Sequence, residues 1–354
     1  QLIITPLGQQ GRGIRWRFFP EGPWAARQPA WGDPVCHLLG RQPDDCRPRR
    51  VIIAFMILVT GATGFVGRHL VPALVEAGWP VRILLLPRRG WRIRLPWPAL
   101  DVDVAMGSLY EPEALLSAMQ GVHTVFHLAS AQWWGGPRDF ERVDIGGTRS
   151  VLQAGRVARI GRLVVMSHLG AAPASAYPLL RAKGQMENLV CESGLPYTIV
   201  RSGILFGEQD SFVNAIAMLL RANPLFFLQP GQGESLLHPL YIHDLTAGLV
   251  QSMDNLDTVD RILEVGGPEY VSFNEMVRTV MRVTHAQRMI VSMPPYLLRW
   301  LTRLIRRVLP RWPTTPQWFD ILASHRTTSL RSMSDTFGIK PARFEDTIVT
   351  YMQG

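Results

Sequence analysis

One glycine-rich segment of the sequence has residue types and spacing suited to binding a phosphate group. Residues 60–67 read Thr-Gly-Ala-Thr-Gly-Phe-Val-Gly, directly after an apolar run and directly before a stretch with helical periodicity. In such a unit the first glycine permits a tight turn, the second lets the backbone approach a pyrophosphate, and the third lets the helix pack on the strand. The amino end of the helix supplies unpaired N–H groups and a positive dipole end. The segment predicts a dinucleotide site around Gly61, Gly64 and Gly67.

The end of the next apolar run indicates which dinucleotide is bound. A carboxylate there bonds a ribose 2′-hydroxyl, as in NAD, whereas an arginine accommodates the 2′-phosphate of NADP. Residues 81–86 lead into Pro87-Arg88-Arg89 without a carboxylate. We therefore predict NADP, with Arg88 at the 2′-phosphate and NAD as the alternative. The competing interpretation is that both arginines are solvated loop charges.

The elements that position this turn follow from the hydrophobic pattern. Apolar, strand-like runs alternate with helical stretches, which predicts an α/β fold with a doubly wound parallel Rossmann sheet. Strands are expected at 57–59, 81–86, 102–105, 124–128, 163–166, 197–200 and 262–265, and helices at 67–77, 112–119, 146–158 and 179–192.

Domain boundaries are expected near residues 55 and 200. Residues 56–200 should form the nucleotide-binding Rossmann domain, with Met56 as the expected natural start. Residues 201–354, which are less regular and carry more prolines, should form a smaller mixed substrate or partner domain that partly returns to the main sheet. Residues 1–55 are rich in Pro, Gly, Arg and Trp without a sustained period, so we expect a disordered extension, with an ordered arm on a partner as the alternative.

Composition narrows the function classes. Hydrophobic residues make up 47% of the 354 residues and charged residues 18%, which is typical of a folded protein. The net charge of +9 comes from arginine clusters that do not resemble the basic surface of a protein that binds a nucleic-acid groove, so no nucleic-acid partner is predicted. Three cysteines without a CxxC pair predict neither a disulfide framework nor a zinc site. Since no apolar run approaches the ~20 residues of a membrane span and no secretory signal is present, we expect a cytoplasmic protein.

Further segments, taken in order, resemble the atypical and extended short-chain dehydrogenase/reductases of the NAD-dependent epimerase/dehydratase superfamily. The chain is most similar to the branch that contains the Rossmann-type accessory subunit of respiratory complex I and its bacterial relatives. This resemblance covers nearly everything from residue 56 to residue 354 and implies NAD(P) binding with oxidoreductase or epimerase chemistry. The segments that carry it are 60–67, 127–130, 147–148, 165–167, 181–183 with Glu187, 198–201, 206–207 and 337–341.

The resemblance also implies a catalytic set, and here the chain departs from the family. In these enzymes a tyrosine four residues before a lysine is the general acid/base, the lysine lowers its pKa and holds the nicotinamide ribose, and a serine binds the substrate oxygen. Lys183 matches the lysine, but Leu179 occupies the tyrosine position and Tyr177 lies six residues before. Six residues place two side chains on nearly opposite helix faces, so Tyr177 could serve only from the loop before the helix. Ser167 is the serine candidate, although the family position falls nearer Leu169.

Two other departures concern the cofactor pocket. Asp144 stands where relatives often carry Asn, and Ser108 stands where many have an adenine-contacting Asp. These departures leave phosphate binding intact and affect proton transfer, while Lys183 keeps a cofactor role unless it is an exposed lysine paired with Glu187. The candidate cofactor-binding residues are Gly61, Thr63, Gly64, Phe65, Val66, Gly67, Arg88, Ser108, Leu109, Leu128, Ala129 and Lys183.

The histidines carry no predicted chemistry. His127 ends an apolar strand, where a histidine is most often a satisfied core residue. His238, His243 and Asp244 suggest a metal site, but their segment resembles a strand-to-helix junction in which Asp244 caps the helix, so no metal is predicted.

The segment 296–309 is amphipathic. Its arginines Arg299, Arg303 and Arg306 lie away from an apolar stripe, as in helices at a membrane surface, although packing inside the second domain explains the same pattern. The stripe comprises Leu297, Leu298, Leu301, Leu304, Ile305 and Val308.

Two functions remain open. The first is an NADP-binding reductase or isomerase of a hydrophobic small molecule. The second is a non-catalytic nucleotide-binding subunit, or an assembly or regulatory protein, at a membrane complex, in peripheral contact with the membrane or a partner through 296–309.

Overall fold

The computed structural model describes residues 55–87, 95–309, 312, 314–323 and 325–352. The expected extension before residue 55 and the arginines Arg88 and Arg89 lie outside the described residues.

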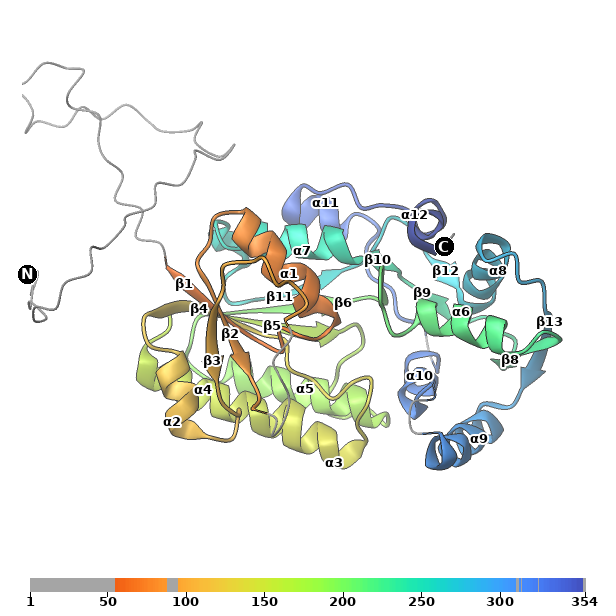
Figure 1. The fold of residues 1–354 in the computed structure, drawn as a ribbon, viewed down its shortest axis with the longest axis horizontal. Coiled ribbons are helices and arrows are strands. Elements are labelled where there is room, and N and C mark those ends of the chain that lie inside the picture. The colour runs from red at the N-terminus through yellow and green to blue at the C-terminus, as the bar shows by residue number, and fades with distance from the viewer. Residues whose placement is uncertain (1–54, 88–94, 310–311, 313, 324, 353–354) are drawn as a thin grey trace, which may run out of the picture. The chain divides into compact units, whose positions relative to one another are not determined.

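A seven-stranded parallel sheet forms the centre of the fold, in the order β11-β6-β5-β4-β1-β2-β3 (Figure 1). The predicted doubly wound Rossmann architecture is thus confirmed, with strand ends shifted by a few residues. The strands are β1 (Met56–Thr60), β2 (Val81–Leu85), β3 (Asp103–Met106), β4 (Val122–His127), β5 (Arg162–His168), β6 (Tyr197–Ser202) and β11 (Arg261–Val265).

Helices cover both faces of this sheet because neighbouring strand residues point to opposite sides. Ile57 and Val59 pack with α1 (Phe65–Glu76), α7 (Ile242–Gln251) and α11 (Ser332–Phe337), whereas Leu58 packs on the other face. The helices there are α2 (Pro112–Ala118), α4 (Gly147–Ala158) and α5 (Pro178–Cys191).

Two helical irregularities lie close to the glycine turn. Pro72 inside α1 cannot donate to the carbonyl of Arg68, and the indole N–H of Trp97 donates to that oxygen instead, at 2.8 Å. Between β4 and α4 the short α3 (Pro137–Asp139) runs into a π-helix, η3 (Phe140–Gly146), which the sequence pattern did not predict. Such π-turns often occur at functional sites, and this one contains Asp144.

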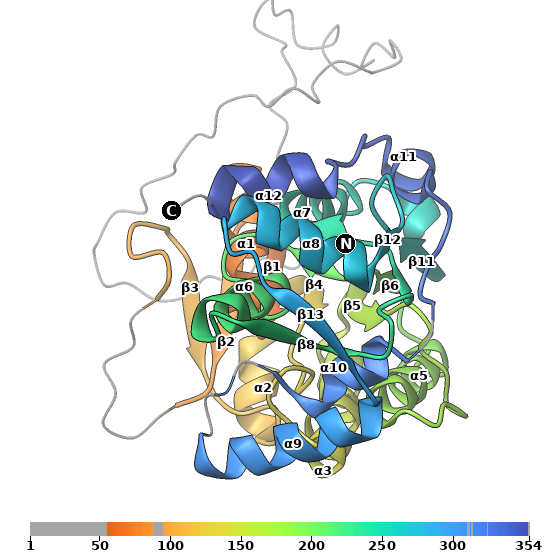
Figure 2. The same ribbon diagram turned by 90° about the vertical axis from the view of Figure 1, so that its right-hand side faces the viewer.

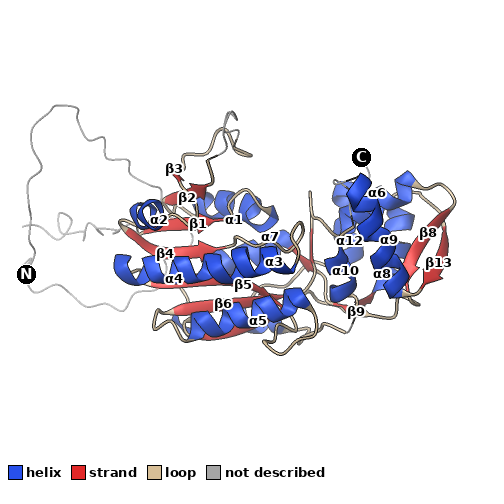
Figure 3. Cartoon of the chain, turned by 90° about the horizontal axis from the view of Figure 1, so that it is seen from below, coloured by secondary structure: helices blue, strands red, loops and turns tan. Residues whose placement is uncertain are grey.

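Apart from η4 (Leu256–Thr258), which contacts the first residues of β5 and β6, the remaining elements lie beyond the carboxyl ends of the strands (Figures 1 and 3). They have a core of their own, in which Phe212 contacts Phe273 and Trp318, yet residues 54–354 form one compact unit and β11 joins the main sheet. The division at residue 200 stays a prediction. The elements are β7 (Leu205–Phe206), α6 (Val213–Ala222), β8 (Phe226–Pro230), β9 (Leu236–Leu237), β10 (Leu240–Tyr241), η4 (Leu256–Thr258), β12 (Val271–Ser272), α8 (Phe273–Val283), β13 (Met289–Met293), α9 (Pro295–Val308), α10 (Pro316–Ile321) and α12 (Phe344–Met352).

Candidate functional site

The glycine turn connects β1 to α1 and lies against the end of β4. Gly61 has φ +72°, and a Cβ atom there would lie 2.6 Å from the backbone nitrogen of Ala129. A Cβ atom on Gly67 would lie 2.6 Å from the Cα atom of Ala62. Since real Cβ atoms do not approach that closely, both positions require glycine. The turn therefore packs directly on Leu128 and Ala129, and the Leu128 N–H donates to the Thr60 carbonyl at 3.1 Å.

Gly64 is different, because the space beside it is open. It precedes α1 with φ −74°, is exposed, and a Cβ atom there would meet only the Gly61 carbonyl, at 3.2 Å. No described side chain caps this end of α1, so the first-turn N–H groups of Phe65, Val66 and Gly67 have no capping partner. With Thr63 exposed beside them, these groups form a cradle that fits a phosphate.

Ser108 and Leu109 follow β3, at the same edge of the sheet as the glycine turn. The Ser108 hydroxyl accepts from the Tyr110 N–H at 3.2 Å, which shapes the turn before α2. Leu109 packs against the core, and a Cβ atom on Gly147 would lie 3.1 Å from it. The carboxyl ends of β1, β3 and β4 thus gather the described candidates for cofactor contact, apart from Lys183, along one edge.

Lys183 is buried in α5 and paired with Asp144. Its Nζ atom lies 2.9 Å from Asp144 Oδ1 and donates to the Met166 carbonyl at 3.3 Å. Asp144 also accepts from the Ser130 hydroxyl at 2.6 Å and from the Ala131 N–H at 3.0 Å. The alternative of an exposed lysine paired with Glu187 is therefore wrong. Two of the three ammonium donors are engaged, and one remains.

Leu179, at the position of the family tyrosine, is completely buried. It packs in a small apolar cluster with Ala131, Phe140, Ile145 and Ala182. The place one turn before Lys183 is thus filled by hydrocarbon, and no proton donor stands there.

Tyr177 precedes α5 as its N-cap residue and lies outside the helix. Its backbone N–H donates to the Ser175 hydroxyl at 3.2 Å, and the guanidinium carbon of Arg326 lies 5.9 Å from its ring centroid. An arginine from the C-terminal part of the chain therefore lies over the Tyr177 ring, and among the described residues no hydrogen bond or ion pair joins Tyr177 to Lys183.

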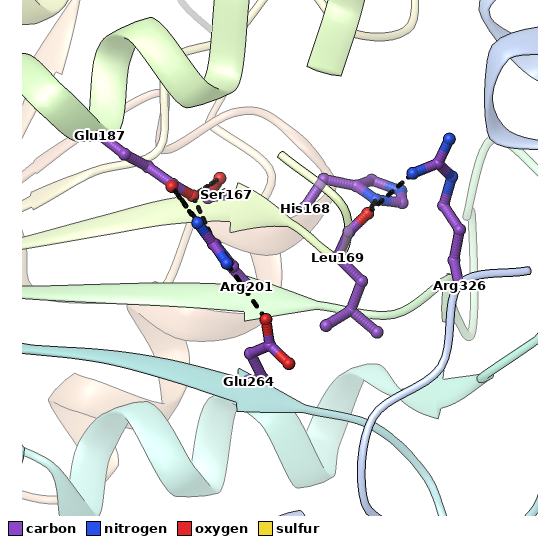
Figure 4. Close-up of polar contacts among 7 residues, drawn as sticks. All are labelled: Ser167, His168, Leu169, Glu187, Arg201, Glu264 and Arg326. Carbon is purple, nitrogen blue, oxygen red and sulfur yellow. Dashed lines mark hydrogen bonds and ion pairs between the residues drawn. The ribbon is translucent and has the colours of Figure 1, made fainter. Parts of the chain in front are cut away.

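Ser167 points into a polar network on the α5 side of β5 (Figure 4). Its hydroxyl donates to Glu187 at 2.5 Å, Glu187 pairs with Arg201 at 2.6 Å, and Arg201 reaches Glu264 at 3.1 Å. The hydrogen bond with Glu187 raises the pKa of Arg201 above its ordinary value. Ser167 is thus part of a polar network that links α5, β6 and β11. Leu169, which is nearer the expected serine position, accepts a hydrogen bond from Arg326 at its backbone carbonyl, at 3.4 Å.

Comparison with known proteins identifies a nucleotide-binding domain in this part of the chain. Residues 61–218 match a family model described as NAD(P)H-binding. The chain is 27% identical, over 84% of its length and 79% of the relative, to the mitochondrial NADH dehydrogenase [ubiquinone] 1 alpha subcomplex subunit 9 of Rattus norvegicus. Residues 61–218 thus form an NAD(P)H-binding domain, and the chain is similar to proteins of the short-chain dehydrogenase/reductase type. This confirms the resemblance found in the sequence.

Solved structures of nicotinamide-nucleotide-binding proteins share the fold. The NADPH-dependent quinone oxidoreductase of Escherichia coli, complexed with NADPH, aligns with a TM-score of 0.65 at 17% identity, over 84% of this chain and 100% of that one. The UDP-glucose 4-epimerase of Thermus thermophilus, complexed with NAD, aligns with a TM-score of 0.63 at 21% identity, over 85% and 99%. The neighbours thus hold either nicotinamide nucleotide.

His127 and His238 of this NAD(P)H-binding protein have structural partners. His127 lies between the hydroxyls of Thr60 at 2.7 Å and Thr148 at 3.1 Å, and burial lowers its pKa to about 4. His238 bonds the Gly267 carbonyl at 2.7 Å.

Asp244 corrects one expectation. It lies in the first turn of α7, which Tyr241 caps, and accepts from the Ala342 N–H at 2.8 Å, so it ties the C-terminal segment to α7 and is not the helix cap. In the part of the chain that the structure describes, no three side chains form a metal-binding group, and no helix could span a membrane.

The sequence missed Arg326. This buried guanidinium donates to the carbonyls of Asp320 at 3.2 Å and Leu169 at 3.4 Å, and burial lowers its pKa. Gly170, with φ +82°, leaves space for it. Arg326 lies in an extended segment without periodicity, so no local signal marks it.

Proposed function

We propose that the chain binds NADPH along the edge formed by the carboxyl ends of β1, β3 and β4. The uncapped first turn of α1 beside Gly64 supports the phosphate position, and Lys183 has one ammonium donor left for the nicotinamide ribose. When bound, the nucleotide supplies a hydride. The proposed binding residues are Gly61, Thr63, Gly64, Phe65, Val66, Gly67, Ser108, Leu109, Leu128, Ala129 and Lys183, with Arg88 at the 2′-phosphate.

We further propose that the nucleotide stabilises or regulates a partner complex and that the chain does not perform tyrosine-dependent carbonyl chemistry. The observation that carries this proposal is the burial of Leu179 where the family tyrosine stands. Asp144 also balances the charge of Lys183, which weakens its influence on any phenol. General acid/base catalysis contributes about 10²–10⁴-fold, so its loss leaves binding intact and turnover slow. Similarity to a subunit of an NADH dehydrogenase supports a role within an assembly.

Thermal unfolding and turnover assays on one preparation test this proposal. NADPH at about 100 times its Kd should raise the free energy of unfolding by about 2.7 kcal/mol, while aliphatic ketones should give no NADPH oxidation above the uncatalysed rate. Ketone reduction that Tyr177→Phe abolishes would overturn the proposal, because Tyr177 would then be an ordinary acid with shifted spacing.

A second candidate is reduction of a hydrophobic quinone-like acceptor, and the same missing proton donor favours it. A ketone becomes a strongly basic alkoxide that needs an acid in the site. A quinone becomes an anion delocalised over an aromatic ring, whose proton comes from water, so the chain needs only to orient it. We expect NADPH oxidation with quinones and none with ketones of similar size, with Gly64→Asp as the inactive control. No quinone-dependent oxidation would eliminate this candidate.

We also propose a cytoplasmic protein in peripheral contact with a membrane or a membrane-bound complex through residues 296–309. The basic and apolar character of α9 supports this contact. In fractionated cells, the protein should sediment with membranes at low salt and be released at high salt. Full recovery in the supernatant at low salt would contradict it.

A further inference from the structure

One side of α9 packs against the rest of the protein. Leu298 and Thr302 are buried against the protein, and Leu301 and Ile305 are half-buried. Arg299 pairs with Asp320 at 2.7 Å, which fixes the helix to α10. The stripe seen in the sequence is thus divided, because packing covers only one part of it.

The other part of the stripe, Leu304 and Val308, is open to solvent and forms one exposed row with Tyr296 and Trp300. The side chains of Tyr296, Trp300, Leu304 and Val308 repeat every four residues and so share one face, on which Trp300 is 62% exposed and Val308 is 76% exposed. A continuous exposed row of this kind is unusual on a folded protein and marks an interaction site.

Further exposed apolar residues lie on the two-stranded sheet that precedes α9. β13 pairs with β8, and Figure 2 shows both strands on the same side of the molecule as α9. The exposed apolar residues are Phe226, Met289 and Val291 in the strands and Leu225 directly before β8. We call these four residues and the exposed α9 row the α9–β13 surface.

The charge around this surface has one sign. Residues 276–319 contain eight arginines and neither Asp nor Glu. Arg303 and Arg307 are exposed beside the apolar row, and among the described residues no carboxylate forms an ion pair with either. The surface therefore combines amphipathic aromatic rings, aliphatic side chains and guanidinium groups that form no ion pair among the described residues.

We propose that the α9–β13 surface docks on a lipid bilayer rich in anionic headgroups. This inference rests on the peripheral contact proposed above and commits it to lipid. Trp and Tyr rings suit the headgroup level, aliphatic side chains enter the acyl boundary, and each arginine near an anionic surface adds about 1 kcal/mol. A second copy would bring like charges together. Residues 1–50 carry eight arginines and four acidic residues, so they share the sign of the surface and are a poor occupant.

Co-sedimentation of the full chain with vesicles tests this docking. Vesicles of phosphatidylcholine with phosphatidylglycerol should bind the protein, pure phosphatidylcholine vesicles should bind it at least about tenfold more weakly, and raised salt should release it. Trp300→Glu with Leu304→Glu should lower binding at least about tenfold. The matched control is Val157→Glu with Leu256→Glu, two exposed apolar residues in α4 and η4 (64% and 81%), which should bind as the wild type does.

Several results would overturn the inference. The first is that the folded protein does not bind anionic vesicles. The second is that it binds both kinds of vesicle equally well. The third is that the control double variant loses as much vesicle binding as the α9 double variant does. If the protein does not bind vesicles and the α9 substitutions dissociate a dimer, the surface belongs to an interface with a second copy. If the α9 double variant still associates with a membrane complex in cells, another part of the chain makes that contact. Titration of NADPH into the same variants keeps the two proposals separate, since nucleotide binding should be unchanged.

Discussion

The Nζ atom of Lys183 lies 2.9 Å from Oδ1 of Asp144, and both side chains are buried. Asp144 comes from the π-helix before α4, whereas Lys183 comes from the middle of α5. The Ser130 hydroxyl and the Ala131 N–H also donate hydrogen bonds to the Asp144 carboxylate. This pair fixes the loop after β4 to α5, and it balances the charge that would otherwise act on a neighbouring phenol.

Removing one member of this pair should be strongly destabilising. Lys183→Met leaves a buried, unpaired carboxylate and should lower the free energy of unfolding by about 3–5 kcal/mol. Asp144→Asn in the same background removes the charge and should recover part of that loss. Urea unfolding of the wild type, the single variants and the double variant measures both effects. A loss below about 1 kcal/mol for Lys183→Met would mean that the ion pair is not formed.

The glycines of the turn should separate folding from binding. Gly64→Asp should fold, because φ −74° suits any residue, yet it should weaken NADPH binding by at least about tenfold by placing a negative charge at the phosphate cradle. Gly64→Ala separates steric from electrostatic effects, because its methyl group crowds the pyrophosphate without adding charge, so it should weaken NADPH binding less than Gly64→Asp does. Gly61→Ala should lower the melting temperature, since its Cβ atom would collide with Ala129. Unchanged NADPH affinity in Gly64→Asp would remove the turn from the binding site.

NADPH should bind more tightly than NADH because the segment after β2 carries Arg88 and Arg89 without a carboxylate. Fluorescence titration should show a difference of about tenfold or more, and Arg88→Ala should reduce it. Arg331→Ala, which removes an exposed arginine near α11, should leave the preference unchanged. Equal affinities in the wild type would refute the 2′-phosphate assignment.

Stability should fall between pH 6.5 and pH 4 through His127 and His168. Burial lowers the pKa of each to about 4, so the unfolded chain binds protons in this window while the folded protein does not. The stability that the neutral rings provide is complete above pH 6.5 and is lost on acidification, by on the order of 3 kcal/mol for each histidine. Urea unfolding across this window should give a shallower slope for His127→Asn than for the wild type. An identical slope would show that His127 does not carry the dependence.

What the sequence predicted well depends on local patterns. The seven strands and the Gly61 turn follow from apolar periodicity and glycine spacing, and both are confirmed. The leucine at the family's tyrosine position, Leu179, four residues before Lys183, was equally visible in the sequence. The partners of Ser167 and Tyr177 were not, because Arg201 and Arg326 come from distant segments that only the folded chain brings near. The division of the α9 stripe likewise depends on packing, which periodicity does not encode.

The crystal structure of the NADPH complex tests the central claim most directly, which is that the nucleotide binds while the family's proton donors are placed elsewhere. We predict the pyrophosphate at the first turn of α1, Leu179 still buried, and Lys183 still paired with Asp144 while its remaining donor meets the nicotinamide ribose. The Tyr177 ring should stay beside Arg326, with its hydroxyl beyond the ~3.2 Å hydrogen-bond reach of the ribose and of Lys183. A Tyr177 hydroxyl within that reach would contradict the account and make the chain a tyrosine-dependent reductase.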